Sequence, residues 1–169
     1  MEIDVEEDCL KILALHQPVA IDLRFIVAVL KINNDLERIG DIAVNIARRA
    51  VYLNSQEPMD IPVDLAGLAG KAMLRQSLDS LVNMDASLAR SVCTADDEVD
   101  EMDRQIQKQI KGRIRAVPER VDYPTQLLRV SRHLERIADH ATNIAEDVIY
   151  MTDGEILRHR AEDYTLRIQ

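Results

Sequence analysis

A twelve-residue stretch occurs twice in this chain, and this repeat constrains the fold more than any other feature. LERIGDIAVNIA begins at Leu36 and LERIADHATNIA begins at Leu134, 98 residues later, with nine of the twelve letters unchanged. Around each copy, apolar residues recur at spacings of three and four, as in an amphipathic helix. Because a helical pattern requires apolar residues but not the same charged ones, we infer that one helical unit is duplicated.

The composition favours an all-α fold. The 169 residues are 47% apolar, which is enough to fill a core, whereas aromatic residues make up only 3%. Glycine and proline contribute five residues each. The abundant residues are those that favour helices rather than sheets, so we expect helical bundles.

Turn-forming residues divide the chain into five expected helices. Pro18 and two loops rich in turn formers, at residues 54–64 and 116–124, mark three boundaries. The tetrapeptide TADD, which begins at Thr94, resembles a capping box and predicts that another helix begins there. The expected helices cover about residues 1–16, 20–53, 64–92, 96–116 and 124–151, and a polar tail or a sixth short helix follows Glu155.

The repeat predicts a tandem pair of three-helix bundles in which the first bundle is incomplete. Residues 57–155 would form a complete bundle, residues 1–56 would keep the motif helix and part of the helix before it, and residues 156–169 would form a tail. The missing helix would leave apolar surface around Val29 and Ile32 uncovered. A late start site, a gene fragment or self-association into a homodimer or higher oligomer would each account for it.

Charge and hydropathy exclude several kinds of partner. The net charge of −9 would repel nucleic-acid phosphates and anionic lipid headgroups, so we expect neither as a partner. The N-terminal residues MEIDVEED lack the basic region of a signal peptide, and no apolar run reaches the length of a membrane span. We therefore expect a cytoplasmic protein that reaches membranes only through its partners. Cys9 and Cys93 form no CxxC pair and are expected to be buried or half-buried thiols rather than a disulfide or redox pair.

Each copy of the repeat carries two carboxylates four residues apart, with an asparagine one turn further along the same helix face. These residues are Glu37, Asp41 and Asn45 in the first copy and Glu135, Asp139 and Asn143 in the second. The plainest interpretation is a solvated face on which arginines such as Arg38 and Arg136 offset the repulsion between like charges. The recurrence of the pair at the same place in both copies favours a functional site instead.

A third pair, Asp96 and Asp100, lies on the expected neighbouring helix, where attraction to the positive end of the helix dipole would be a sufficient structural reason for it. If this pair faced Glu135 and Asp139, four carboxylates would converge and would need a cation to remain ionised together. Oxygen ligands suit hard ions such as Fe³⁺, Mn²⁺, Mg²⁺ or Ca²⁺. Zinc more often takes histidine or cysteine, and His140 would be either a ligand or, more simply, a hydrogen-bonding or packing residue.

Two longer segments, DLRFIVAVLKINNDLERIGDIAVNIA (residues 22–47) and HLERIADHATNIAEDVIYMTDGE (residues 133–155), resemble the PhoU family of phosphate-transport regulators. The resemblance includes HQPVAIDLR at the first helix joint, covers most of the chain and implies two similar three-helix bundles. It also implies multinuclear metal clusters at repeated E(D)xxxD motifs, with iron as the best-known occupant. In this chain the motifs fall on Glu37, Asp41, Asp96, Asp100, Glu135 and Asp139. The first copy lacks the Asp-bearing start of its middle helix, so only two motif carboxylates remain there.

The resemblance implies a non-enzymatic regulator that limits phosphate uptake and damps phosphate-starvation signalling by linking a phosphate-specific ABC transporter to a sensor histidine kinase. Two alternatives remain open, a metal-free helical scaffold and a ferritin-like di-metal carboxylate protein. The second relies on Glu-xx-His pairs, and no glutamate in the chain is followed by histidine three residues later. Since the chain also contains no glycine-rich phosphate loop and no GxSxG motif, we expect no catalytic residues.

Overall fold

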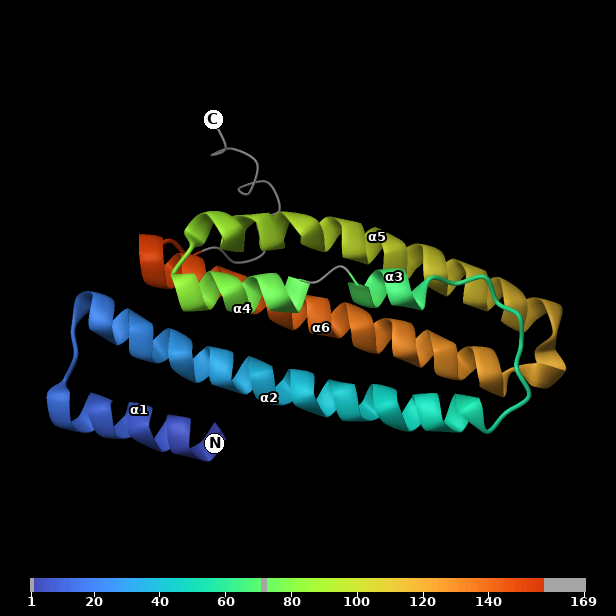
Figure 1. Cartoon of the computed structure of the whole chain (residues 1–169), viewed down its shortest axis with the longest axis horizontal. Helices are drawn as coiled ribbons and strands as arrows, with labels where there is room; N and C mark the ends of the chain where they lie inside the picture. Colours follow the sequence, from blue (N-terminus) through green and yellow to red (C-terminus); the bar gives the residue numbers. More distant parts are fainter. Residues whose placement is uncertain (1, 71–72, 157–169) are drawn as a thin grey trace.

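A computed structural model of the protein describes residues 2–70 and 73–156, and all regular structure in this part of the chain is helical (Figure 1). The helices are α1 (Glu2–His16), α2 (Ala20–Asn54), α3 (Leu65–Gly70), α4 (Met73–Asn83), α5 (Ala86–Ala116) and α6 (Asp122–Asp153), with a 3₁₀ turn, η1 (Pro118–Arg120), before α6. The predicted all-α fold is confirmed. None of these helices is both long and apolar enough to cross a membrane.

Helix α6 lies at the centre of the molecule (Figure 1). It packs against α5, α2 and α4, whereas α1 packs along the outer side of α2. The Lys31 Nζ atom of α2 lies 2.7 Å from Asp147 Oδ1 of α6, and Arg49 Nη1 lies 2.8 Å from Gln126 Oε1. Rising residue numbers on α2 therefore meet falling numbers on α6, so the two copies of the repeat lie on adjacent, antiparallel helices.

The core is built on the apolar face of α6. The bulkiest fully buried apolar side chains of α5 and α6 are Val92, Val99, Ile110, Ile144, Val148, Ile149 and Met151. The same cluster includes Ala28, Ile32 and Ile39 of α2, so both copies of the repeat contribute to one core. Cys9 and Cys93 are buried, as expected. The predicted division between residues 56 and 57 stays a prediction, and the predicted tail lies, from residue 157 onward, outside the described residues.

The predicted boundary between the third and fourth helices is wrong. The chain turns at Met84 and Asp85, because α4 ends at Asn83 and α5 begins at Ala86. The Asp85 carboxylate accepts a hydrogen bond from the backbone N–H of Leu88 at 2.9 Å, which caps the first turn of α5. The single helix expected over residues 64–92 is thus divided among α3, α4 and the start of α5, with residues 71–72 outside the described chain.

Thr94, the predicted helix start, lies inside α5. Its hydroxyl donates to the backbone carbonyl of Arg90 at 3.0 Å instead of capping a helix. A threonine that bonds back to the preceding turn is compatible with a continuous helix. Asp96 and Asp100 therefore lie well inside α5, and the dipole at its N-terminus does not explain their placement.

The expected exposure of Ile32 is also wrong. Ile32 is 4% exposed and belongs to the core, and Val29 is partly buried. Both border a recess that is also lined by Val5 of α1 and Leu81 of α4. Exposed apolar side chains gather instead at the joint between α1 and α2, at Leu15, Val19, Ile21, Leu23 and Phe25. The predicted self-association stays a prediction, and this joint is an apolar surface available to it.

Replacing Asp85 with alanine tests the cap of α5. The N–H of Leu88 would lose its partner, and we expect the free energy of unfolding to fall by about 1 kcal/mol, the usual effect of removing an N-cap side chain. Urea denaturation followed by circular dichroism measures the change. Asp79→Ala is the matched control, because Asp79 is an exposed residue of α4 whose contact with Arg75 is 3.9 Å long. Equal losses in the two variants would contradict the capping role.

Candidate metal centre

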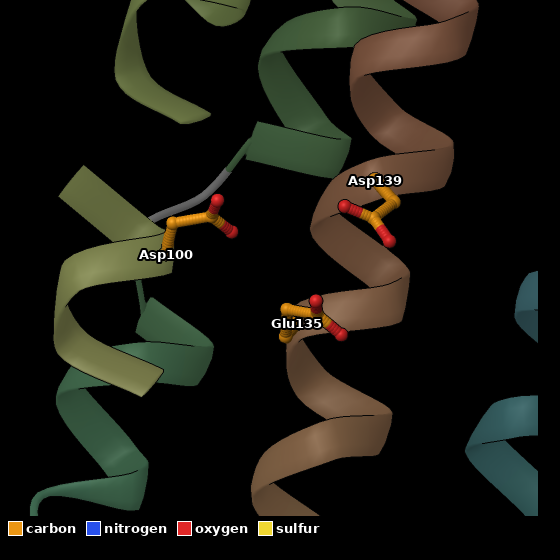
Figure 2. Close-up of side chains that lie close together, drawn as sticks. All are labelled: Asp100, Glu135 and Asp139. Carbon is orange, nitrogen blue, oxygen red and sulfur yellow. The ribbon is translucent and has the colours of Figure 1, made fainter. Parts of the chain in front are cut away.

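Three carboxylates meet where α5 and α6 pack together (Figure 2). Asp100 comes from α5, and Glu135 and Asp139 come from successive turns of α6; we call these three residues the acidic cluster. One oxygen atom of each side chain lies within 4.8 Å of one oxygen of each of the others. Ligand oxygens around one hard cation are up to about 5 Å apart, so a single ion could contact all three.

Asp96 lies one turn before Asp100 and just outside the acidic cluster. Its Oδ1 atom accepts a hydrogen bond from the hydroxyl of Thr142 on α6 at 3.1 Å, and the side chain is partly buried. The structure therefore brings three of the four expected carboxylates of the second copy together. The fourth, Asp96, lies beside them and is hydrogen-bonded to the uncharged side chain of Thr142.

Asp103 is a buried carboxylate beside the cluster that the sequence analysis missed. Its side chain accepts hydrogen bonds from the Ser131 hydroxyl and from the Gln107 amide, and the residue is 5% exposed. Asp103 follows Asp100 by three residues on α5, a spacing that places it on the same helix face as the motif pair. The sequence analysis considered only carboxylates four residues apart. A search for carboxylates three or four residues apart would also have found Asp103.

The carboxyl group of Glu135 is poorly compatible with a negative charge in the metal-free protein. Burial is the largest cause that raises its pKa to about 7. The negative charges of Asp139, Asp103 and Asp100 add to this effect, and the positive charge of Arg132 opposes it. A cation bound here would remove the need for the proton, since it would stabilise the ionised carboxylates directly.

The same causes act on the two neighbouring aspartates. Burial raises the pKa of Asp96 to about 6, although the hydrogen bond from Thr142 acts in the opposite direction. The charges of Asp139 and Asp100 contribute to this rise. The pKa of Asp139 is raised, first by partial burial and then by the charge of Asp100. Several carboxyl groups thus compete for ionisation in one place, and an oxygen-only ligand set of this kind fits a hard cation.

His140 lies next to Asp139 in sequence, but it is hydrogen-bonded in another direction. Its Nδ1 atom lies 2.8 Å from Asp35 Oδ1 of α2, and the residue is 8% exposed. Asn143 is exposed one turn beyond Asp139, and Asn45 lines a recess near the C-terminal end of α2. None of the hydrogen bonds described for these three residues involves the acidic cluster, although His140 acts electrostatically to lower the pKa of Asp139.

The first copy of the motif is arranged differently. Glu37 and Asp41 are exposed on α2, and neither belongs to a group of three metal-ligating side chains within the described residues. Glu37 instead borders a mainly apolar recess of about 410 Å³, whose walls include Val29, Leu36 and Leu81. Among the described residues, three candidate metal ligands therefore come together only in the second copy.

The metal-free protein should lose stability as the pH rises from about 4.5 to about 7. Because the pKa of Glu135 is raised to about 7, the folded chain keeps a proton in this range that the unfolded chain releases. We expect a loss on the order of 1 kcal/mol, since solvent screens part of the effect. Urea unfolding of chelator-treated protein at several pH values measures it.

Two variants control this pH experiment. Glu135→Gln should flatten the dependence, because glutamine does not titrate. Glu101→Gln, which changes an exposed glutamate of α5 that lies 3.3 Å from Arg104, should leave the dependence unchanged. An unfolding free energy of the wild type that stays constant or increases over the range would contradict the assignment.

Comparison with known proteins agrees with this architecture. The chain matches the PhoU domain family over residues 1–50 and 65–148. A protein of Aquifex aeolicus, named as a phosphate-specific transport system accessory protein PhoU homolog, is 40% identical over 95% of this chain and 73% of its own length. A protein of Caulobacter vibrioides with the same name is 38% identical over 93% of this chain and 70% of its own length.

Solved structures show the same fold. The crystal structure of PhoU from Pseudomonas aeruginosa superposes with a TM-score of 0.84 at 36% identity, covering 91% of this chain and 75% of that one. The crystal structure of the phosphate transport system regulatory protein PhoU from Streptococcus pneumoniae has a TM-score of 0.81 at 30% identity, covering 93% and 74%. The resemblance carried by the repeat is therefore confirmed, and the chain belongs to the PhoU family.

Proposed function

We propose that this protein is an accessory protein of a phosphate-specific transport system, and that it limits phosphate uptake and damps phosphate-starvation signalling. The observation that carries the proposal is the similarity to relatives that bear the name of that system. The similarity extends across nearly the whole chain and includes both copies of the acidic repeat.

The action that we propose is contact with other proteins rather than catalysis. The partners are the phosphate ABC transporter and a sensor histidine kinase, which the protein would meet at the cytoplasmic side of the membrane. The shape of the molecule supports this, because α2 and α5 are long helices on the outside of the central α6 and offer extended surfaces. Asp100 and Asp139 are exposed, so the acidic cluster suits ion binding and docking better than chemistry in an enclosed pocket.

We further propose that the acidic cluster binds a hard metal ion, with iron as the first candidate. Asp100, Glu135 and Asp139 would supply the ligand oxygens, and Asp96 would stand next to them. The raised pKa values of Glu135 and Asp139 support the proposal, because burial and the neighbouring carboxylates disfavour the ionised forms that a cation would stabilise. The ion would supply that charge, join α5 to α6 and change the electrostatic surface that partners meet.

Elemental analysis of the purified, untagged chain tests the metal proposal. We expect iron or another hard metal in the wild type and its loss in the double variant Glu135→Ala, Asp139→Ala. The matched control is Glu37→Ala, Asp41→Ala, which removes the equivalent pair on α2 and should keep the metal. Equal metal content in the wild type and the Glu135, Asp139 variant would support a metal-free scaffold instead. Light scattering on the same samples measures the oligomeric state.

Deletion of the gene in its host tests the regulatory role. If the protein damps the starvation response, cells without it should express alkaline phosphatase even in high phosphate. A plasmid copy of the wild type should restore repression, and the Glu135→Ala, Asp139→Ala variant shows whether repression needs the acidic cluster. Unchanged repression in the deletion strain would contradict the proposed function.

A further inference from the structure

The region where the end of α2 meets the start of α6 has a charge opposite to that of the whole chain. Residues 42–56 and residues 123–134 contain four arginines, Arg48, Arg49, Arg129 and Arg132, and no aspartate or glutamate. The two segments lie side by side because α2 and α6 are antiparallel (Figure 1). A chain of net charge −9 thus contains a local positive region.

A recess of about 290 Å³ opens in this region. We call it the arginine recess. It is lined by Asn45, Arg48, Arg49, Tyr52 and Gln126. Each of these side chains carries at least one N–H or O–H donor, and none is a carboxylate. The recess therefore offers hydrogen bonds to a ligand that accepts them and carries negative charge.

Arg49 is held in place with part of its bonding capacity unused. Its Nη1 atom donates a hydrogen bond to Gln126 Oε1 at 2.8 Å, which positions the guanidinium across the two helices. Its Nε atom is buried and has no hydrogen-bond partner, a state that costs free energy. A second buried nitrogen without a partner, His133 Nδ1, lies two turns along α6 from Gln126.

The two arginines of the recess also lack an acidic neighbour. Across the part of the chain that the structure describes, no carboxylate forms an ion pair with Arg48 or Arg49. The arginines of surface helix faces are usually offset by acidic residues three or four positions away. Here the positions one turn before and after both arginines are apolar or uncharged.

We propose that the arginine recess binds a phosphate-type oxyanion, either free inorganic phosphate or a phosphoryl group attached to another molecule. Arginine matches such an anion well, because its planar group donates two parallel hydrogen bonds to two oxygens. The amides of Asn45 and Gln126 and the hydroxyl of Tyr52 can bind the remaining oxygens. The bond from Arg49 Nη1 to Gln126 holds the guanidinium at the recess before any anion binds.

This site is separate from the acidic cluster. Gln126 and Glu135 are nine residues apart on α6, which corresponds to about 14 Å along the helix axis. The inference does not depend on the proposed role in phosphate transport or on the proposed metal, and its test stands if either of them fails.

Isothermal titration of the untagged chain with sodium phosphate, against sodium chloride at equal ionic strength and with EDTA present, tests the proposal. We expect saturable binding at one site, weakened about tenfold or more by Arg49→Gln, because a charged hydrogen bond is lost. Arg48→Gln should weaken it similarly and, since Arg48 is exposed, without risk to the fold. Arg75→Gln is the matched control, because its side chain is 87% exposed on α4 and the charge change is the same.

A second titration with O-phosphoserine identifies the source of the anion. Tighter binding of inorganic phosphate assigns the recess to the free ion, and tighter binding of phosphoserine assigns it to an attached phosphoryl group. Three results would overturn the proposal: no saturable binding of either compound, equal weakening by Arg75→Gln and Arg48→Gln, or binding that is seen only when EDTA is left out of the buffer. The last result would mean that the anion binds to a metal ion.

Discussion

The burial of α6 between α2 on one side and the α4–α5 pair on the other is the constraint on which the rest of the structure depends. This helix, whose core residues run from Val130 to Met151, packs against α5, α2, α4 and α3. This packing brings Asp100 to Glu135 and Asp139, and it also brings Arg49 to Gln126. Both candidate sites are therefore made by the same central helix, and neither exists on an isolated helix.

The sequence predicted most helices correctly, including the two that carry the repeat, because a helix can be recognised from the spacing of apolar residues within its own segment. Apolar spacing of three and four over the long segments is sufficient to identify α2 and α6, and Pro18 and Gly154 lie where helices end. The boundary between α4 and α5 was predicted incorrectly because Asp85 and Thr94 are both residue types that can cap the start of a helix. Asp85 makes the cap and Thr94 does not, and the difference depends on a backbone turn at Met84, where φ is 51°.

The candidate site was predictable only in part. The repeated spacing of four identified Glu135, Asp139 and Asp100, because helical geometry sets which side chains share a face. The separation of Asp96 from the cluster, and the bond between His140 and Asp35, depend on contacts between helices that spacing does not reveal. Asp103 could have been found from its register, whereas the recess around Arg49 required knowledge of which segment of α6 lies opposite.

The polar contacts between α2 and α6 have a mechanical consequence. Lys31 is paired with Asp147, and Asp35 with His140, and the side chains of Asp147, Asp35 and His140 are each less than 15% exposed. If α2 slid along α6 by one turn, both pairs would separate and leave polar groups without partners in places that water hardly reaches, which is costly. The two helices are thus locked against slippage. The joint at the N-terminal end of α2, near Phe25, therefore cannot move along α6 by one turn without separating both pairs.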